Sequence, residues 1–194
     1  MKYKKITNSD ITFFIKTLSK ENVFCSEVDL KKYSHDETED ISYLPEIVLK
    51  PSSAKEISEC LEYCNKQNIP VTACGARTGL SGGSIPLYGG VALSVENLNK
   101  IISIDKENLQ ATVESGVINQ NFKSEVEKSG LFYPPDPASL GSCMLGGNVA
   151  ENSGGPKALK YGVTRDYVLN LEVVLADGSI IWTGANVLKN ATGY

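Results

Sequence analysis

The chain has 194 residues, of which 41% are hydrophobic and 22% charged, and its formal net charge is −4. This length suits one large domain or two small lobes with a shared core, and the composition is that of an ordinary globular protein. The negative charge argues against nucleic-acid binding, which normally needs a basic face. No apolar run is long enough to span a bilayer, and the basic N-terminus lacks the apolar segment of a secretory signal.

Five cysteines form an odd set without the dense spacing of a disulfide scaffold. This usage predicts a reducing compartment and hence a cytoplasmic protein, with peripheral attachment at the inner face of the membrane as an option. Cys60 and Cys64 share one face of an expected helix. Because the chain has one histidine, these two thiols are better explained as core side chains than as zinc ligands, and we predict no metal site.

The first half of the chain predicts helices that alternate with short strands. Helical spacing of apolar residues over 11–18, with Ser9 as a candidate cap, predicts the first helix. Residues 31–43 are polar, acidic and too irregular to enter a core. A buried strand at Ile47–Leu49, a helix opened by the capping-box pair Ser53 and Glu56, and a strand from Pro70 complete a βαβ unit, which implies parallel pairing and a right-handed crossover.

The second half predicts mainly antiparallel structure. Short strands are expected at 91–95, 101–104 and 109–113, and the alternation of the last two predicts a half-exposed antiparallel sheet. A helix carrying the apolar positions 118, 122 and 126 ends at Gly130. Asp177-Gly178 joins two further strands as a hairpin, with Trp182 expected to pack behind it. The expected fold class is therefore α+β, with a small βαβ lobe followed by a larger, mainly antiparallel α/β lobe.

A glycine-rich loop, "GARTGLSGG", runs from Gly75 to Gly83 directly after a predicted strand. It has neither the lysine-Ser/Thr pair of a P-loop nor the spacing of a dinucleotide fingerprint, and Pro86, Gly89 and Gly90 prevent a helix immediately after it. What remains is a nest of loop amides that can hold a diphosphate, with added donors from Arg77, Thr78 and Ser81. The alternative is a glycine-rich connection that binds nothing.

A second stretch, "YPPDPASLGSCMLGGNVAENSGGPKALKYG", spans residues 133–162. Two prolines stiffen its entry and would hold Asp136 and Ser139 in place for a polar ligand group. Asn148, Asn152 and Ser153 offer amide and hydroxyl contacts, and the glycines allow backbone to pack flat on a planar group. The two stretches are expected to form opposite walls of one long cleft, suited to an elongated ligand with a central diphosphate and an aromatic ring.

Four segments in this order resemble the FAD-linked oxidases of the vanillyl-alcohol oxidase superfamily: "PEIVLKPSSAKEI", "PVTACGARTGLSGG", the stretch from Pro134 to Gly178, and the terminal "TGY". The resemblance is to the glycolate oxidase and D-lactate dehydrogenase branch, which includes D-2-hydroxyglutarate dehydrogenase, from about Tyr33 onward. It implies a PCMH-type FAD-binding domain over 45–194, with lobes at 45–95 and 96–194, the second truncated at its C-terminal end, after a helical lead-in at 1–44.

The resemblance also implies the cofactor-binding residues. The first loop would take the FAD diphosphate through Gly75, Ala76, Arg77, Thr78, Gly79, Leu80, Ser81 and Gly82. The second stretch would line the rest of the cleft through Pro135, Asp136, Ser139, Gly146, Gly147, Asn148, Asn152, Gly154, Gly155 and Gly162. FAD is expected to be non-covalent, because the one histidine, His35, precedes the loop in an acidic segment that is more often solvated. Asp36 is expected to fix the lead-in loop, and the pair Arg165-Asp166 to be structural.

The chain departs from relatives that read close to "PVTPRGAGTGLSGG", since it has Ala73, Cys74 and Arg77 where they have proline, arginine and glycine. If position 77 needs positive φ, the arginine strains the loop; if it does not, Arg77 replaces the charge lost at Cys74. Relatives also continue past "TGY" into a substrate-binding cap with the catalytic histidines and any metal. We therefore expect no catalytic residue in this chain, which resembles the front of a longer enzyme: a fragment, a split subunit or an incomplete reading frame.

The leading hypothesis is the FAD-binding portion of a D-2-hydroxy-acid dehydrogenase or oxidase of the glycolate and D-lactate type. Hydride would pass from the substrate to flavin N5, and a base and cap outside this chain, which a second chain could carry, would complete the site. Electrons would pass to a quinone, an electron-transfer protein or oxygen. A non-catalytic flavin-binding or subunit-docking module is the alternative, and a nucleotide-sugar reductase fits the "PPDPAS" and "NSGGPKALKYG" segments less well.

Overall fold

A four-stranded sheet forms the centre of the first lobe in the computed structural model, which describes residues 3–187. The strand order is β1 (Val23–Phe24), β2 (Ile47–Leu49), β4 (Val91–Ser94) and β3 (Val71–Cys74). β4 pairs in parallel with both β2 and β3, whereas β1 is antiparallel to β2. The predicted βαβ unit is confirmed, but β2 and β3 do not pair directly because β4 lies between them. Burial of β2 and β4 on both faces explains their continuous apolar runs.

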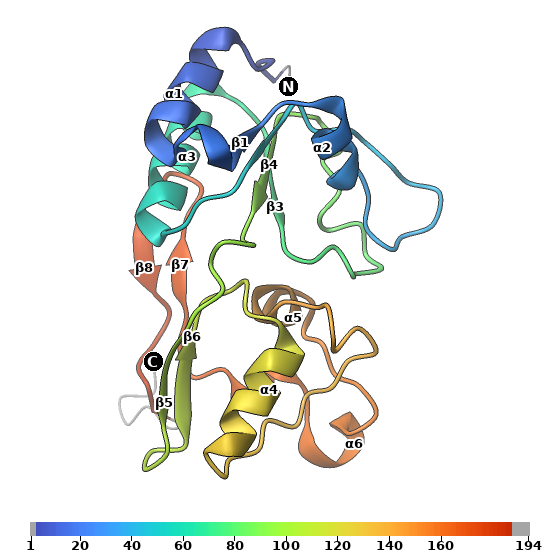
Figure 1. The fold of residues 1–194 in the computed structure, drawn as a ribbon, viewed down its shortest axis with the longest axis vertical. Coiled ribbons are helices and arrows are strands. Elements are labelled where there is room, and N and C mark those ends of the chain that lie inside the picture. Colours follow the sequence, from blue (N-terminus) through green and yellow to red (C-terminus); the bar gives the residue numbers. More distant parts are fainter. Residues whose placement is uncertain (1–2, 188–194) are drawn as a thin grey trace.

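Helices α1 (Asn8–Leu18) and α3 (Ala54–Gln67) cover one face of this sheet (Figure 1). Cys60 and Cys64 lie on the buried face of α3 in this core, as predicted. The Ser53 hydroxyl accepts a hydrogen bond from the Glu56 amide, so the predicted start of α3 is confirmed. The predicted start of α1 was too late in the chain: its N-cap is Thr7, and Ser9 lies inside the helix.

The other face of the sheet is covered by a segment for which we predicted no core residue. Short helices η1 (Lys20–Asn22) and α2 (Glu27–Lys32) precede it. Tyr33, Ser34 and Asp36 are buried, and Tyr33 packs against Val48 and Cys74 of the sheet. The prediction for 31–43 was therefore wrong, because a phenol ring and hydrogen-bonded polar groups can be buried without any apolar periodicity.

The second lobe combines an antiparallel pair with α4 (Asn119–Lys128). Strands β5 (Ile101–Asp105) and β6 (Gln110–Val113) pair as predicted, with one half-exposed face. Their inner face packs against α4 and against the first turn of α5 (Leu145–Glu151). Two further short helices follow, α6 (Ala158–Tyr161) and η2 (Thr164–Tyr167).

A hairpin of β7 (Glu172–Val174) and β8 (Ile180–Trp182) ties the two lobes together (Figure 1). Its tip reaches α3, where the Ser58 hydroxyl donates to the Gly178 carbonyl at 2.5 Å. Gly178 has φ +89°, and a β-carbon there would lie 2.8 Å from the Glu62 β-carbon. The predicted hairpin is confirmed, but Trp182 is 59% exposed rather than packed behind it. Across residues 3–187, none of the helices combines the length and apolar character that a bilayer crossing requires.

Candidate functional site

The first glycine loop leaves β3 at Cys74 and continues without a helix, as predicted. Within the described part of the chain, no backbone N–H of residues 76–84 donates a hydrogen bond to another protein group. Several carbonyls of the loop are bonded instead: Gly79 accepts from the Glu37 amide at 3.0 Å, and Gly82 accepts from the Ile85 amide at 3.2 Å. The loop therefore presents consecutive free donors, which is the chemistry of an anion-binding nest.

Arg77 sits in this loop with φ +59°, in the left-handed region. A non-glycine residue adopts this conformation at a cost of about 1 kcal/mol or more. The sequence left two alternatives open, and the structure shows the one in which the arginine strains the loop. Its guanidinium is packed inward: Nη1 donates to the Gly75 carbonyl at 3.1 Å and lies 3.3 Å from Glu96 Oε1. The same group lies over the Tyr33 ring, 4.2 Å from its centroid.

Glu96 is the centre of the charged cluster that receives Arg77. Lys50 Nζ lies 2.6 Å from Glu96 Oε2, and the Tyr33 hydroxyl donates to Oε1 at 2.6 Å. Burial alone would raise the pKa of Glu96, but the hydrogen bonds from Lys50 and Tyr33 and the charges of Lys50 and Arg77 lower it to about 2. Burial would lower the pKa of Lys50, whereas its contacts with Glu96 and Tyr33 raise it. The cluster thus stays ionised, with one carboxylate beside two cations.

The second glycine stretch contains a helix that the sequence analysis missed. α5 includes Gly146 and Gly147, whose low helix propensity favoured a loop. Packing explains the glycine at 146, since a β-carbon there would lie 2.8 Å from the Ser115 β-carbon. The Leu145 amide donates to the Val117 carbonyl and the Gly146 amide to the Ser115 carbonyl, so neighbouring backbone fixes the first turn.

The structure brings the two glycine stretches together at the first turn of α5. A β-carbon added to Gly75 would lie 3.9 Å from the Gly147 amide nitrogen, and the Ser81 hydroxyl donates to Glu151 Oε1 at 2.6 Å. Among the residues that the structure describes, nothing lies within 4 Å of a β-carbon added to Gly147 itself, so that side of α5 is open there. Asn148 is buried, and its side-chain amide nitrogen has no hydrogen-bond partner within residues 3–187. Open backbone and an unsatisfied buried donor fit a ligand with acceptor atoms.

Most other predicted residues of the second stretch maintain its own shape. The Asp136 amide donates to the Gly154 carbonyl, and its carboxylate pairs with Lys157 at 3.1 Å. A β-carbon on Gly155 would lie 2.2 Å from the Asp136 carbonyl oxygen. The Asn152 backbone ends α5 in the left-handed region, and its side-chain oxygen accepts from the Arg165 amide at 3.0 Å. The Ser139 carbonyl accepts two turn hydrogen bonds, and Gly162, with φ +85°, ends α6.

The polar anchor beneath this stretch comes from α4, and sequence reasoning missed it. Asn119 and Lys123 are buried, and both donate to the Pro135 carbonyl, at 3.4 and 3.3 Å. Burial lowers the pKa of Lys123, and the nearby charge of Lys157 lowers it further. The sequence did contain a signal for this anchor. Asn119 and Lys123 are four residues apart, so they share one helix face and interrupt the apolar stripe of Phe122 and Val126.

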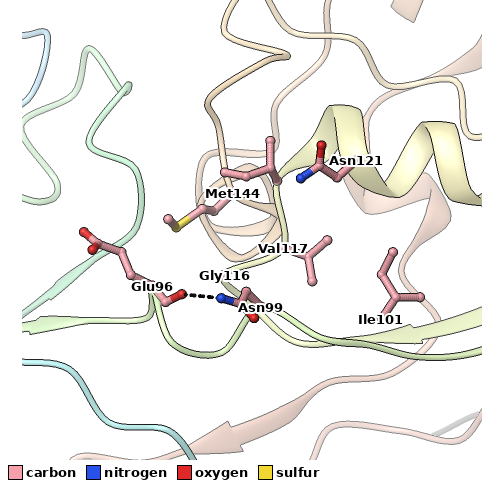
Figure 2. A pocket seen from close by; sticks show the side chains of 8 residues that line it. Glu96, Asn99, Ile101, Gly116, Val117, Asn121 and Met144 are labelled. Atoms are coloured by element: carbon pink, nitrogen blue, oxygen red, sulfur yellow. Dashed lines mark hydrogen bonds between the residues drawn. The ribbon is translucent and has the colours of Figure 1, made fainter. Parts of the chain in front are cut away.

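A pocket of about 270 Å³ lies between the segment that follows β4 and the starts of α4 and α5 (Figure 2). Glu96 and Met144 are among its lining residues, and the Asn99 side chain donates to the Glu96 carbonyl at 3.1 Å. The Met144 β-carbon also lies 4.0 Å from a β-carbon added to Gly75. The pocket therefore adjoins the contact between the two glycine stretches.

The predictions for His35, Asp36 and Asp166, which lie outside this region, agree with the structure. His35 is exposed, and the buried carboxylate of Asp36 accepts from the Thr38 amide at 2.9 Å, which fixes the lead-in loop. Asp166 accepts from the Val163 amide at 2.8 Å, in keeping with a structural role. No cluster of three or more potential metal-ligating side chains occurs between residues 3 and 187. The terminal "TGY" lies outside the described residues.

Comparisons with known proteins identify the family. A model of the FAD binding domain family matches residues 45–184. The chain is 47% identical over 174 residues to the glycolate oxidase subunit GlcD of Bacillus subtilis, covering 90% of this chain and 37% of that protein. It is 41% identical over 193 residues to a D-lactate dehydrogenase of Anaerostipes hadrus, covering 99% of this chain and 40% of that protein.

A solved structure of p-cresol methylhydroxylase with bound substrate shares the fold, with a TM-score of 0.78 at 23% identity. The match covers 98% of this chain and 38% of that one. The chain thus spans about two fifths of the length of the relatives it matches. With this family match, the chain belongs to the FAD binding domain family, and it shares its fold with p-cresol methylhydroxylase.

Proposed function

We propose that residues 76–84 bind the diphosphate of a non-covalent FAD, with Gly147 and Asn148 on the opposite wall of the cleft. The observation that carries this proposal is the row of consecutive backbone amides in 76–84 without protein partners, beside the open face of α5. Asn148 adds a buried, unsatisfied side-chain donor. Non-covalent binding follows from the position of His35, the one histidine, which is exposed in the lead-in segment.

Bound FAD supplies reversible acceptance of a hydride, and this chain's residues hold and orient it. Free loop amides would accept the diphosphate charge without reorganisation, because the carbonyls of Gly79 and Gly82 are already bonded away from the ligand. The pocket beside Glu96 and Met144 would continue the cleft on the other side of Gly75. Division into a lead-in at 1–44 and lobes at 45–95 and 96–194 is part of the proposal.

The relatives support the FAD-binding portion of a D-2-hydroxy-acid dehydrogenase or oxidase, since the matched proteins are a glycolate oxidase subunit and a D-lactate dehydrogenase. Because this chain spans 37% and 40% of them, we propose that the substrate cap and catalytic base belong to the remaining length, in a continuation or a second chain. A small 2-hydroxy acid would be oxidised, and a quinone, an electron-transfer protein or oxygen would take the electrons. Five free cysteines support a reducing, cytoplasmic location, where peripheral contact with the inner membrane face would suit a quinone acceptor.

Titration of the purified chain with FAD tests the proposal. We expect saturation at about one FAD per chain, protein-bound flavin absorbance, and competition by ADP, which shares the diphosphate. D-lactate and glycolate are then supplied with an artificial electron acceptor, with and without a polypeptide carrying the remaining length of the relatives. Turnover only in the mixture supports the division of roles, whereas protein that stays colourless at millimolar FAD contradicts the cofactor site.

A further inference from the structure

The guanidinium of Arg77 packs into the protein, and its contacts there hold the start of the glycine loop. The side chain is 20% exposed, and its guanidinium contacts three groups from three segments: the Tyr33 ring, the Glu96 carboxylate and the Gly75 carbonyl. Tyr33 ends α2, and Glu96 follows β4. Arg77 therefore links the start of the loop to two rigid parts of the first lobe.

The contact with the Gly75 carbonyl has a consequence for the neighbouring amide. In a trans peptide the C=O and the N–H point in opposite directions. Because Arg77 Nη1 holds the Gly75 oxygen at 3.1 Å, the Ala76 N–H of the same peptide plane points away from the guanidinium. A free Gly75 carbonyl could turn toward a bound diphosphate, where two negative groups would repel.

We infer that Arg77 is a positioning residue for the cofactor loop: its guanidinium, held by Tyr33 and Glu96, fixes the Gly75 carbonyl inward and aims the Ala76 amide at the ligand. This inference rests on the proposed function. It gives this strained arginine a role in FAD binding that requires no contact between the arginine and the ligand.

The two effects of Arg77 fall on different measurements, which makes the inference testable. Its positive φ is already present without a ligand, so replacing the arginine by glycine relieves a strain of the fold and by itself leaves FAD affinity unchanged. The same change removes a charge-assisted hydrogen bond and a ring contact that hold the loop ready for the ligand, which would weaken FAD binding roughly tenfold. If Arg77 positions the loop, the result is weaker binding.

The experiment compares FAD dissociation constants for the wild-type chain and Arg77→Gly, Arg77→Ala and Arg77→Lys, at a temperature where circular dichroism shows each to be folded. We expect Arg77→Gly and Arg77→Ala both to bind FAD roughly tenfold more weakly, because both remove the guanidinium and the strain that Arg77→Ala retains belongs to the fold. Arg77→Lys keeps a cation over the Tyr33 ring and should recover part of the loss. Arg165→Ala is the matched control, because it removes the same charge from a side chain that is 79% exposed.

The outcomes separate this inference from the proposed function. A wild-type chain that does not bind FAD overturns the proposed function, and with it the role of Arg77. A wild-type chain that binds FAD while Arg77→Gly binds equally or more tightly overturns the positioning role alone. If Arg77→Gly does not fold, Tyr33→Phe and Tyr33→Leu take its place: Phe keeps the ring beneath the guanidinium and Leu removes it. Equal FAD affinity of these two variants would likewise overturn the inference.

Discussion

The two glycine-rich stretches contain similar residues and use them in different ways. In the first loop, the backbone amides of 76–84 donate to no group among residues 3–187, and the Gly79 and Gly82 carbonyls accept from the Glu37 and Ile85 amides. In the second stretch, amide donors are used within the fold: Asp136 donates to Gly154, and Gly146 donates to Ser115. The first loop thus leaves its backbone amides unbonded among the described residues, whereas the second stretch uses its amides to hold its own backbone in place.

The glycines of the two stretches differ in what a side chain would meet. In the first loop, a β-carbon on Gly79 would meet only the Glu151 carboxylate at 3.7 Å. In the second, a β-carbon on Gly155 would overlap the Asp136 backbone. Glycine density therefore goes with two different environments, an open backbone and close packing of backbone, and a sequence does not distinguish them.

The largest expected effect comes from Gly155→Ala, which should abolish the packing of the second stretch. A β-carbon 2.2 Å from the Asp136 carbonyl, at φ +114°, cannot be placed without backbone movement. We expect a loss of unfolding free energy on the order of 3 kcal/mol, measured by urea denaturation of the chain without FAD. Gly79→Ala is the matched control in the first loop and should change stability by less than about 1 kcal/mol. Equal losses would mean that both stretches serve the fold.

Gly147→Leu should separate ligand binding from folding within a single helix. Because nothing in the described part of the chain lies within 4 Å of its β-carbon, the substitution should leave the unfolding free energy unchanged, or raise it by up to about 1 kcal/mol through helix propensity. A leucine on the open face should weaken FAD binding on the order of a hundredfold by steric exclusion. Gly146→Ala is the control, since its contact with Ser115 predicts lower stability. Unchanged FAD affinity in Gly147→Leu would remove α5 from the cofactor site.

Local sequence patterns correctly predicted the helices, strands and turns that depend on residues close together in the chain. Ser53 and Glu56 marked the start of α3 through a capping contact three residues apart, and Asp177-Gly178 marked the hairpin through the positive φ that its turn needs. The apolar runs at 47–49 and 91–94 marked buried strands. The order β2-β4-β3 was missed, because nothing local says which parallel neighbour a strand takes.

The features missed in the site depend on contacts between distant segments. α5 forms around two glycines because Ser115 and Val117 fix its first turn. The inward guanidinium of Arg77 depends on Tyr33 and Glu96, each nineteen or more residues away along the chain. Sequence reasoning located the two glycine stretches, but their contact through Gly75 and Gly147 came only from the fold.

The smallest expected effect concerns how the two stretches are anchored. The first loop is anchored by the ion cluster at Glu96, whereas the Pro135 carbonyl of the second is held by Asn119 and Lys123. The folded-state pKa of Glu96 is about 2, below its ordinary value of 4.5. Stability linked to Glu96 is therefore fully present above about pH 4.5 and is lost as the pH falls toward 2.

Glu96→Gln should accordingly reduce the acid sensitivity of the chain between pH 5 and pH 3. The expected change in slope amounts to about 1 kcal/mol or less over this range, because the side chain is still 27% exposed and solvent screens the pair. Urea denaturation at several pH values measures it. Asp10, whose pKa is also lowered, adds acid sensitivity that the variant retains, so only the difference between the two curves reports on Glu96. Parallel curves would show that the cluster holds the loop by packing and hydrogen bonding, without a net contribution from the ionised carboxylate.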